Sequence, residues 1–276
     1  QFFYEVPIVR LFADADERSR FEAKRGRIDQ WTGEALEQGS SPYHAPHGGV
    51  TWKGGGRLDT RRFLEASRGY FLEAGLLEER EVDLHGPLPD TEVTVLCAGA
   101  AGLGTGPFGF LPERRAKGEL LTVRILGFPD ERIVSRNGWI IPLGGGLFRA
   151  GSTYRWDDLT DAVTEDGRTQ IEELIGSFTS LPYEVLEHVA GVRPIVRQSR
   201  PVIGRHPEIE NLVILNGLGS KGVLYAPGVA ERLVSHLCEG TEIEEAVEWR
   251  ALAGSPCSHA VNCESARERA GGSRSR

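Results

Sequence analysis

The stretch NLVILNGLGSKGVLYAPGVAERLVSHL, residues 211–237, is the part of the sequence that indicates the fold most clearly. It begins with the short apolar run Leu212–Leu215, whose residues favour a β-strand. Gly217, Gly219 and Gly222 follow with the spacing G-x-G-x-x-G, and apolar residues then recur at close to helical spacing. The pattern therefore predicts a strand, a glycine turn and a helix in that order.

The glycine turn has the properties of an anion-binding turn. Glycines let the backbone turn sharply and approach a ligand closely. The helix behind them offers free N–H groups and the positive end of its dipole. The alternative is a glycine-rich turn that binds nothing, because the bare motif is weak. Cys238, Glu239 and Gly240 follow the helix in place of a second strand, so the turn is expected to approach a cofactor from the carboxyl-terminal side of a sheet built mostly by earlier sequence.

The composition is that of an ordinary globular protein, with 39% hydrophobic and 26% charged residues among 276. The net charge of -8 argues against non-specific binding to nucleic acid or an anionic membrane. No apolar run approaches the roughly 20 residues that cross a bilayer. Cys97 and Cys238 are expected to be buried in apolar segments, and this favours a reducing compartment, the cytoplasm. The chain starts at Gln1 and has no methionine, which we interpret as the sign of a fragment.

The rest of the chain alternates between two kinds of layer. The helix expected at 58–75 and the buried strand at 91–98 suit an α/β layer, whereas 118–154 suits an antiparallel sheet. Residues 211–237 then return to the α/β pattern, so we expect an α/β (α+β) fold whose chain crosses between two domains. The pattern further predicts a strand at 76–84, helices at 164–175 and 181–189, and a disordered tail at 251–276.

Two weaker motifs carry no function in this interpretation. A second G-x-G-x-x-G spans 104–109, but Pro107 and Phe108 interrupt it and no helical pattern follows. His44 and His47 form H-x-x-H, but no third ligand lies nearby, so we predict no metal site. The loop that carries these histidines is expected to face a ligand instead.

Four stretches carry a resemblance to a known family. They are VTVLCAGA (93–100), RAKGELLTVRI (115–125), GSTY (151–154) and GVRPIVRQSRPVIGRHPEIENLVILNGLGSKGVLYAP (191–227). Together they resemble the D-amino-acid oxidase superfamily of FAD-dependent oxidoreductases, its glycine-oxidase-like branch in particular. The resemblance implies a partial FAD-binding Rossmann-like layer interleaved with an antiparallel-sheet substrate domain. It assigns 1–57 and 118–190 to the substrate domain, 58–117 and 191–250 to the FAD-binding domain, and 251–276 to a tail outside both.

The sequence departs from the family at its beginning. Members of the family open with a βαβ unit that holds the first G-x-G-x-x-G and binds the adenosine and pyrophosphate of FAD. No such unit precedes Gln1, so this chain alone is not expected to hold FAD tightly or to be active by itself. A bare, apolar edge on the sheet of residues 91–98 would indicate a truncated chain and not a remodelled one.

The resemblance also implies roles for individual residues. Arg193 matches the arginine that pairs with a substrate carboxylate, a task that suits the forked guanidinium; its alternative is an ion pair that bridges the two domains. Lys221 lies either in solvent or near the flavin, where it would help oxygen or electron chemistry. His47, Tyr154 and Arg155 are weaker pocket candidates. The implied cofactor-binding residues are Val82 at the adenine, Ala98 and Gly99 at the pyrophosphate, and Gly217, Leu218, Gly219, Ser220, Lys221, Gly222 and Val223 at the flavin ring.

The implied reaction oxidises a C–N bond of an amino acid or small amine by hydride transfer to FAD, after which the imine hydrolyses. The expected partner is a small-molecule amine or amino acid, with no nucleic acid and no membrane. In some relatives the glycine turn supplies a second basic group, where this chain has Ser220 and Lys221, so the substrate stays open. Two alternatives remain. One is the flavin oxidoreductase domain that finishes a wobble-uridine modification in tRNA, which the charge of -8 disfavours. The other is a non-catalytic remnant that acts as a binding module.

Overall fold

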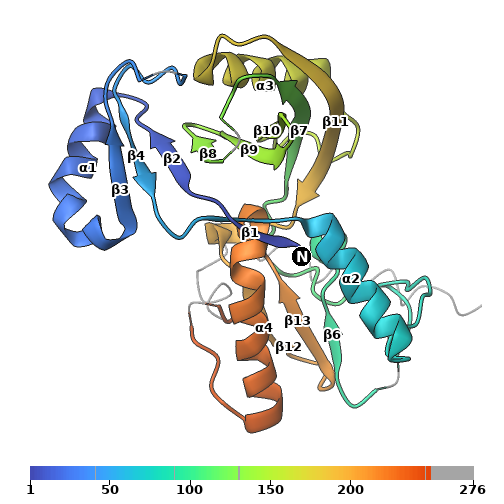
Figure 1. The fold of residues 1–276 in the computed structure, drawn as a ribbon. Coiled ribbons are helices and arrows are strands. Elements are labelled where there is room, and N and C mark those ends of the chain that lie inside the picture. Colours follow the sequence, from blue (N-terminus) through green and yellow to red (C-terminus); the bar gives the residue numbers. More distant parts are fainter. Residues whose placement is uncertain (41, 90, 130, 246, 250–276) are drawn as a thin grey trace, which may run out of the picture. The chain divides into compact units, whose positions relative to one another are not determined.

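The chain forms two compact units, which Figure 1 traces in sequence colours. The computed structural model describes residues 1–40, 42–89, 91–129, 131–245 and 247–249. Unit 1 consists of Gln1–Glu81 and Ala116–Arg193, and unit 2 consists of Val82–Arg115 and Pro194–Arg276. Both units combine helices with β-sheet, so the predicted mixed α/β fold is confirmed.

An eight-stranded sheet forms the centre of unit 1 (Figure 1). In spatial order its strands are β11 (Tyr183–Arg193), β7 (Ala116–Ile125), β10 (Leu147–Gly151), β9 (Trp139–Gly144), β8 (Ile133–Ser135), β2 (Ile8–Leu11), β4 (Gly49–Trp52) and β3 (Thr32–Leu36). Neighbours are antiparallel except for β2 and β8, which run parallel. This confirms the antiparallel sheet predicted at 118–154, where Asn137 turns the hairpin between β8 and β9 with a φ of 56°.

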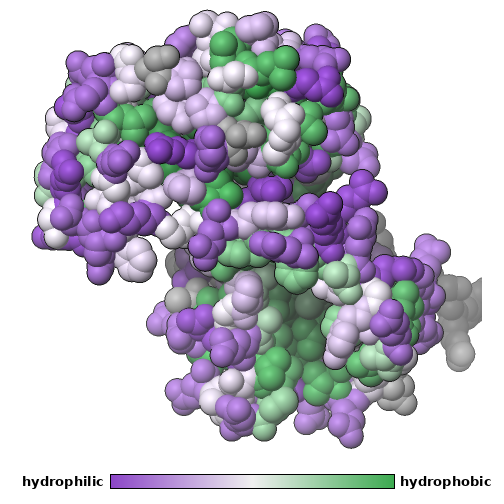
Figure 2. Space-filling model, in the orientation of Figure 1, coloured by the Kyte–Doolittle hydropathy of each residue, from purple (hydrophilic) through white to green (hydrophobic). Residues whose placement is uncertain are grey.

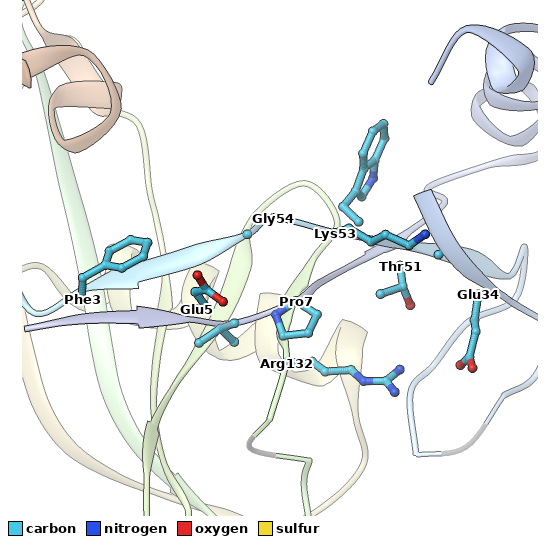
Figure 3. Close-up of a pocket in the computed structure, with 12 residues that line it drawn as sticks. Phe3, Glu5, Pro7, Glu34, Thr51, Lys53, Gly54 and Arg132 are labelled. Atoms are coloured by element: carbon cyan, nitrogen blue, oxygen red, sulfur yellow. The ribbon is translucent and has the colours of Figure 1, made fainter. Parts of the chain in front are cut away.

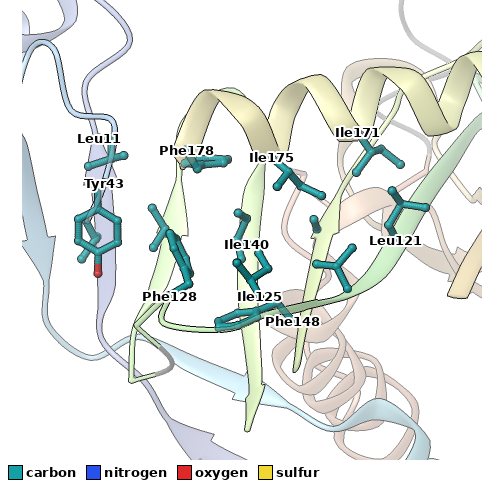
Figure 4. Close-up of a cluster of buried hydrophobic side chains, with 14 of the residues drawn as sticks. Leu11, Tyr43, Leu121, Ile125, Phe128, Ile140, Phe148, Ile171, Ile175 and Phe178 are labelled. Carbon is teal, nitrogen blue, oxygen red and sulfur yellow. The ribbon is translucent and has the colours of Figure 1, made fainter. Parts of the chain in front are cut away.

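Helix α3 (Glu165–Phe178) packs its apolar face on this sheet (Figure 4). The helix begins after Thr164, whose hydroxyl accepts a hydrogen bond from the Gly167 N–H as an N-cap. The buried cluster includes Ile171, Ile175 and Phe178 from α3 and Leu121, Val123, Ile125, Ile140 and Phe148 from the strands. Burial of each such side chain stabilises the fold by about 1.5–3 kcal/mol, so this cluster is the main core of unit 1.

Unit 1 also contains two helices with no buried residue, α1 (Ala15–Ile28) and α2 (Thr60–Glu73). Each has an aspartate N-cap, Asp14 accepting from the Glu17 N–H and Asp59 from the Arg62 N–H. Helix α2 confirms the helix predicted at 58–75. The antiparallel ribbon of β1 (Phe3–Glu5) and β5 (Gly56–Leu58) precedes it.

Unit 2 is built around the strand, turn and helix predicted at 211–237. Its three-stranded sheet has the order β12 (Val202–Arg205), β13 (Leu212–Asn216) and β6 (Thr94–Leu96), with β13 parallel to β6. Helix α4 (Gly222–Glu239) packs on this sheet, and it ends at Gly240 in the left-handed conformation. The buried residues at this contact are Val229 and Leu233 on α4 and Ile203 and Val213 on the strands.

Strand β6 leaves an apolar edge on this sheet. Within the described residues, no strand pairs with the edge of β6 that faces away from β13. Val93 and Val95 at this edge are each 38% exposed. Apolar side chains gather over the sheet of unit 2, as the green surface of Figure 2 shows. A parallel strand is normally covered on both faces, so β6 offers an edge to which a further strand could add.

Four predictions are wrong. Residues 76–84 form no strand, because this charged run lies exposed without a pairing partner among the described residues. Residues 181–189 are not helical but enter β11, because pairing with β7 outweighs a short helical pattern. The strand expected at 91–98 is shorter and partly exposed, because β6 is an edge strand. Cys97 and Cys238 are exposed free thiols and not buried, since they lie on the open sides of β6 and α4.

The boundaries between the units differ from those that the resemblance implied. Residues 58–81, which include α2, group with unit 1, and the chain changes unit after Glu81, Arg115 and Arg193. The tail at 251–276 lies outside the described residues. No described helix combines the length and apolar character that a bilayer-spanning helix needs.

Candidate active site

The glycine turn between β13 and α4 has the conformation that its sequence predicts. Gly217 and Gly219 adopt φ values of 74° and 56°, a region that other residues rarely enter. A Cβ on Gly217 would lie only 3.0 Å from the Arg200 carbonyl oxygen. No side chain caps the start of α4. These features fit a turn that receives an anionic or polar part of a cofactor.

Asn216 joins this turn to the loop after β6. Its side chain is 2% exposed, its Nδ2 donates to the Gly99 carbonyl oxygen at 2.9 Å, and its Oδ1 accepts from the Gly217 N–H at 2.8 Å. Unit 2 therefore brings together Ala98, Gly99 and the turn that starts at Gly217. The sequence analysis missed Asn216, although a polar residue at the end of the apolar run 212–215 is a usable signal.

We expect Asn216→Asp to lower the free energy of unfolding of unit 2 by about 1–2 kcal/mol, because the new carboxylate oxygen cannot donate to the buried Gly99 carbonyl. Asn211→Asp is the matched control, since Asn211 donates in the same way to the Thr91 carbonyl, but at an exposed site. Urea unfolding of the two variants measures the difference. Equal effects of about 0.5 kcal/mol or less would show that Asn216 does not hold the turn.

Other residues predicted for the cofactor are more exposed. Ser220 and Lys221 face solvent, and Lys221 Nζ lies 5.9 Å from the centre of the Tyr225 ring. Leu218 and Gly222 are partly buried, and Val223 is 55% exposed. Val82 is 45% exposed in the loop before β6, and no described hydrogen bond joins it to the turn. The exposed Lys221 side chain fits both alternatives, a solvated turn residue and a group near a bound flavin.

Arg193 lies at the end of β11 in unit 1, with its guanidinium held by neutral acceptors. Nη1 donates to the Lys117 carbonyl oxygen at 3.1 Å, and Nη2 donates to the Ser152 hydroxyl at 2.7 Å and to the Thr153 carbonyl oxygen at 3.1 Å. The Tyr154 ring lies 4.0 Å from Cζ. Burial of the guanidinium lowers the pKa of Arg193 from its ordinary value.

Two observations bear on the role of this guanidinium. Among the described residues, no carboxylate lies within ion-pair distance of Arg193, so its charge has no counter-ion in this part of the chain. A Cβ on Gly118 of β7 would collide with the guanidinium, so only glycine allows it to lie against this strand. The sequence analysis missed Gly118. A partly buried, fixed and uncompensated guanidinium has the properties of a carboxylate-binding group.

His44 and the weaker pocket candidate Arg155 both have partners on α3. His44 in the H-x-x-H loop lies with Nδ1 3.2 Å from the Gly176 carbonyl oxygen, so it fastens this loop to α3. His47 is partly buried in the same loop. Arg155 forms an ion pair with Asp166 of α3. The described residues contain no cluster of three histidine, cysteine, aspartate or glutamate side chains that could hold a metal ion.

A buried charged network lies beside Arg193. Lys117 and Glu119 on β7 are both fully buried, and Lys117 Nζ lies 2.5 Å from Asp158 Oδ2. The Lys117 hydrogen bond holds the pKa of Asp158 well below its usual range. Glu119 accepts hydrogen bonds from the N–H and hydroxyl of Thr164, and its Oε2 lies 2.8 Å from His188 Nε2. Glu119 therefore fastens the start of α3 to the sheet.

Glu119 is expected to make the stability of unit 1 sensitive to acid. Burial alone would raise the pKa of Glu119, but the hydrogen bonds from Thr164 and the charge of Lys117 lower it overall. A carboxylate whose pKa is lower in the folded state than in the unfolded state stabilises the fold at a pH above the unfolded-state pKa. This stabilisation is lost as pH falls through the folded-state pKa. Urea unfolding measured from pH 7 to well below the ordinary glutamate pKa of 4.5 should show this loss of stability. Glu119→Gln should reduce the loss. An unchanged pH dependence in Glu119→Gln would contradict the assignment.

Unit 1 also contains a cavity of about 640 Å³ (Figure 3). Aromatic side chains, cations and carboxylates line it, among them Phe3, Trp52, Lys53, Arg132, Glu5 and Glu34. None of the residues predicted for catalysis or cofactor binding is part of its wall. Its wall also shares no residue with the groups that contact the Arg193 guanidinium.

The comparison with known families identifies the class of protein. The family model described as DAO, FAD dependent oxidoreductase, matches residues 3–236. The chain therefore belongs to this family of FAD-dependent oxidoreductases, as the resemblance of its sequence implied. FAD is the cofactor that gives the family its name, and the open glycine turn of unit 2 fits part of such a ligand.

Two curated relatives are similar to part of this chain. The chain is 29% identical over 195 residues to "tRNA 5-methylaminomethyl-2-thiouridine biosynthesis bifunctional protein MnmC" of Caulobacter sp. (strain K31), covering 65% of this chain and 32% of that protein. It is 28% identical over 163 residues to glycine oxidase of Bacillus subtilis (strain 168), covering 54% of this chain and 42% of the relative. The chain thus spans well under half the length of these relatives.

Solved structures show the same fold at lower identity. Iminodiacetate oxidase from Chelativorans sp. BNC1 matches with a TM-score of 0.71 and 21% identity, over 89% of this chain and 76% of that chain. Glycine oxidase from Geobacillus kaustophilus matches with a TM-score of 0.72 and 19% identity, over 87% and 72% of the two chains. These likenesses support the glycine-oxidase-like fold.

Proposed function

We propose that this chain is part of an FAD-dependent oxidoreductase that oxidises the C–N bond of an amino acid or small amine, and that Arg193 binds the carboxylate of the substrate. The observation that carries the proposal is the set of groups that hold the Arg193 guanidinium, which we call the Arg193 frame: the Lys117 and Thr153 carbonyl oxygens, the Ser152 hydroxyl and the Tyr154 ring. Its guanidinium is fixed by three neutral acceptors, rests on Gly118 and has no carboxylate partner among the described residues. Such a group gains most from a ligand that brings the missing negative charge.

The cofactor-binding part of the proposal rests on unit 2. Residues 217–223 would lie against the flavin ring, and Ala98 and Gly99 would meet the pyrophosphate. Val82 is proposed at the adenine and Lys221 near the flavin. Bound FAD supplies the oxidant for the reaction. Arg193 contributes orientation, since a bound carboxylate fixes the position of the neighbouring C–H bond.

The proposal assigns unit 1 to substrate binding and unit 2 to FAD binding. It also puts the enzyme in the cytoplasm, where the exposed thiols of Cys97 and Cys238 would stay reduced. The partner is a small molecule, because the charge of -8 disfavours contact with a polyanion.

A second function is kept because four of the curated relatives carry the same tRNA-biosynthesis name. In this alternative the chain belongs to a flavin oxidoreductase that acts on a modified uridine of tRNA. The amine to be oxidised would then be part of an RNA, and the protein would need a cationic surface that the net charge does not suggest.

The test is anaerobic reduction of the FAD-loaded protein. We expect glycine or iminodiacetate to bleach the visible band of the oxidised flavin, and methylamine, which lacks a carboxylate, to bleach it far more slowly. A band that no amine bleaches would contradict the proposal. Bleaching by tRNA but by neither amino acid would favour the second function.

A further inference from the structure

Lys117 is a buried charge for which the proposed reaction has no direct use. It is fully buried on β7, and its Nζ lies 2.5 Å from Asp158 Oδ2. Asp158 Oδ1 in turn accepts from the N–H and the hydroxyl of Thr160, at 2.9 Å and 2.7 Å. A buried ammonium is costly unless it is paired and hydrogen-bonded. The pair is therefore a fixed point at which the segment 152–158 meets the sheet.

The backbone strengthens this attachment. The Lys117 N–H donates to the Arg155 carbonyl oxygen at 2.8 Å, and the Arg155 N–H donates to the Lys117 carbonyl oxygen at 3.0 Å. The segment 152–158 thus runs beside the start of β7. Two backbone hydrogen bonds between Lys117 and Arg155, two further hydrogen bonds between Thr153 and Glu119, and the ion pairs of Asp158 with Lys117 and of Arg155 with Asp166 hold it there. The attachment places residues 152–154 beside the end of β11.

The same segment supplies most of the frame around Arg193. Ser152 and Thr153 provide two of the three acceptors of its guanidinium, and Tyr154 provides the ring over it. The third acceptor is the carbonyl oxygen of Lys117 itself. Loss of the ion pair would leave the other contacts of the segment in place, but would remove the contact that fixes its end at Asp158 to β7.

We propose that Lys117 and Asp158 are positioning residues, and that the ion pair between the buried Lys117 and the partly exposed Asp158 holds segment 152–158 in the register that aims the Arg193 guanidinium at a carboxylate. The inference rests on the proposed function, in which Arg193 binds the carboxylate of the substrate. It assigns the specificity for carboxylate-bearing amines to four groups acting together, namely Arg193, Tyr154, Lys117 and Asp158.

The experiment measures anion binding without turnover. Acetate, and acetamide as its neutral counterpart, are titrated into the full chain labelled with ¹⁵N-arginine. The Arg193 Nε–H resonance is assigned by its loss in Arg193→Lys. We expect saturable binding of acetate and little binding of acetamide. Asp158→Asn should weaken acetate binding about 5- to 30-fold, the range that follows from losing one or two kcal/mol.

Glu184→Gln is the matched control. It breaks the Arg124–Glu184 ion pair of 2.6 Å. This pair, like that of Lys117, starts from β7, but it joins β7 to β11 and lies exposed. Its acetate affinity should equal that of the unaltered chain. Equal weakening in both variants would overturn the positioning role, because the effect would then be one of general loosening. Unaltered acetate affinity in folded Asp158→Asn would overturn it as well.

A double variant covers the case in which Asp158→Asn fails to fold. Lys117→Met with Asp158→Leu removes both charges, which buried sites tolerate better than one unpaired charge. It should fold and bind acetate more weakly than the unaltered chain, because the directed contact between β7 and residue 158 is then lost; unaltered affinity would contradict the proposal. Acetate binding that Arg193→Gln leaves unchanged would instead refute the proposed function, and this inference with it.

Discussion

Replacement of Arg193 with glutamine is expected to lower kcat/KM for a carboxylate-bearing amine by about 10- to 150-fold. Charge-assisted hydrogen bonds to a carboxylate contribute about 1.5–3 kcal/mol, and about 1.4 kcal/mol corresponds to a tenfold change in rate. Glutamine keeps a donor for the Lys117 carbonyl but loses the charge and the fork. Steady-state kinetics with glycine or iminodiacetate, on the FAD-loaded protein, measure the effect.

The Arg193 variants separate a role in substrate binding from a role in stability. Arg193→Lys keeps the charge without the forked geometry and should retain part of the activity. Arg124→Gln, which breaks an exposed ion pair with Glu184, should leave kcat/KM within about twofold, since exposed pairs contribute little. Oxidation of methylamine should be slow in the unaltered protein and equally slow in Arg193→Gln. An equal loss for methylamine and glycine would show that Arg193 does not bind the carboxylate.

The second large effect is expected from Gly167→Ala at the start of α3. A Cβ there would collide with the carboxylate of Glu119, which is fully buried and bonded to Thr164. Overpacking of this kind costs about 1–3 kcal/mol, and displacement of a hydrogen-bonded carboxylate adds a similar amount. We therefore expect the free energy of unfolding to fall by about 2–5 kcal/mol, as measured by urea denaturation.

Gly176→Ala in the same helix provides a control of opposite sign. Nothing lies within 4 Å of the Cβ that it would introduce. Alanine is favoured over glycine inside a helix by about 0.5–1 kcal/mol, so this variant should be slightly more stable than the unaltered protein. Destabilisation by both substitutions would mean that α3 does not tolerate alanine anywhere, and that the Gly167–Glu119 contact has no special role.

Local sequence was sufficient where the pattern was long and periodic. Residues 211–237 gave strand, turn and helix as predicted, because the glycines and the apolar repeat act over short distances along the chain. Residues 58–75 were correctly predicted to be helical for the same reason, with Asp59 as the N-cap. Residues 181–189 were misjudged, because their pairing with β7, some sixty residues earlier in the chain, decides their structure.

The details of the site depend on contacts that no local pattern reveals. Asn216 bonds to Gly99 across 117 positions of the sequence, and Arg193 bonds to Lys117 across 76. Gly118 is one glycine among 35, and its role becomes visible only when the Arg193 side chain is placed against it. Sequence reasoning therefore found the charged group of the proposed substrate site, but not the groups that hold it.

The family assignment and the proposed activity rest on different observations. The family model matches most of the chain, whereas the curated relatives differ in what their names say they act on. In the proposed function Arg193 connects the two, since a fixed guanidinium would select carboxylate-bearing amines within a family whose shared cofactor is FAD.

The most direct test of the account is a titration of the purified chain with FAD, followed through the visible absorption spectrum of the flavin. The account predicts weak but saturable binding that changes the shape of the flavin band, and Gly219→Ala should weaken this binding further because alanine strains the left-handed conformation of the turn. A spectrum that remains that of free FAD at every protein concentration would contradict the claim that residues 217–223 form a flavin site in this chain.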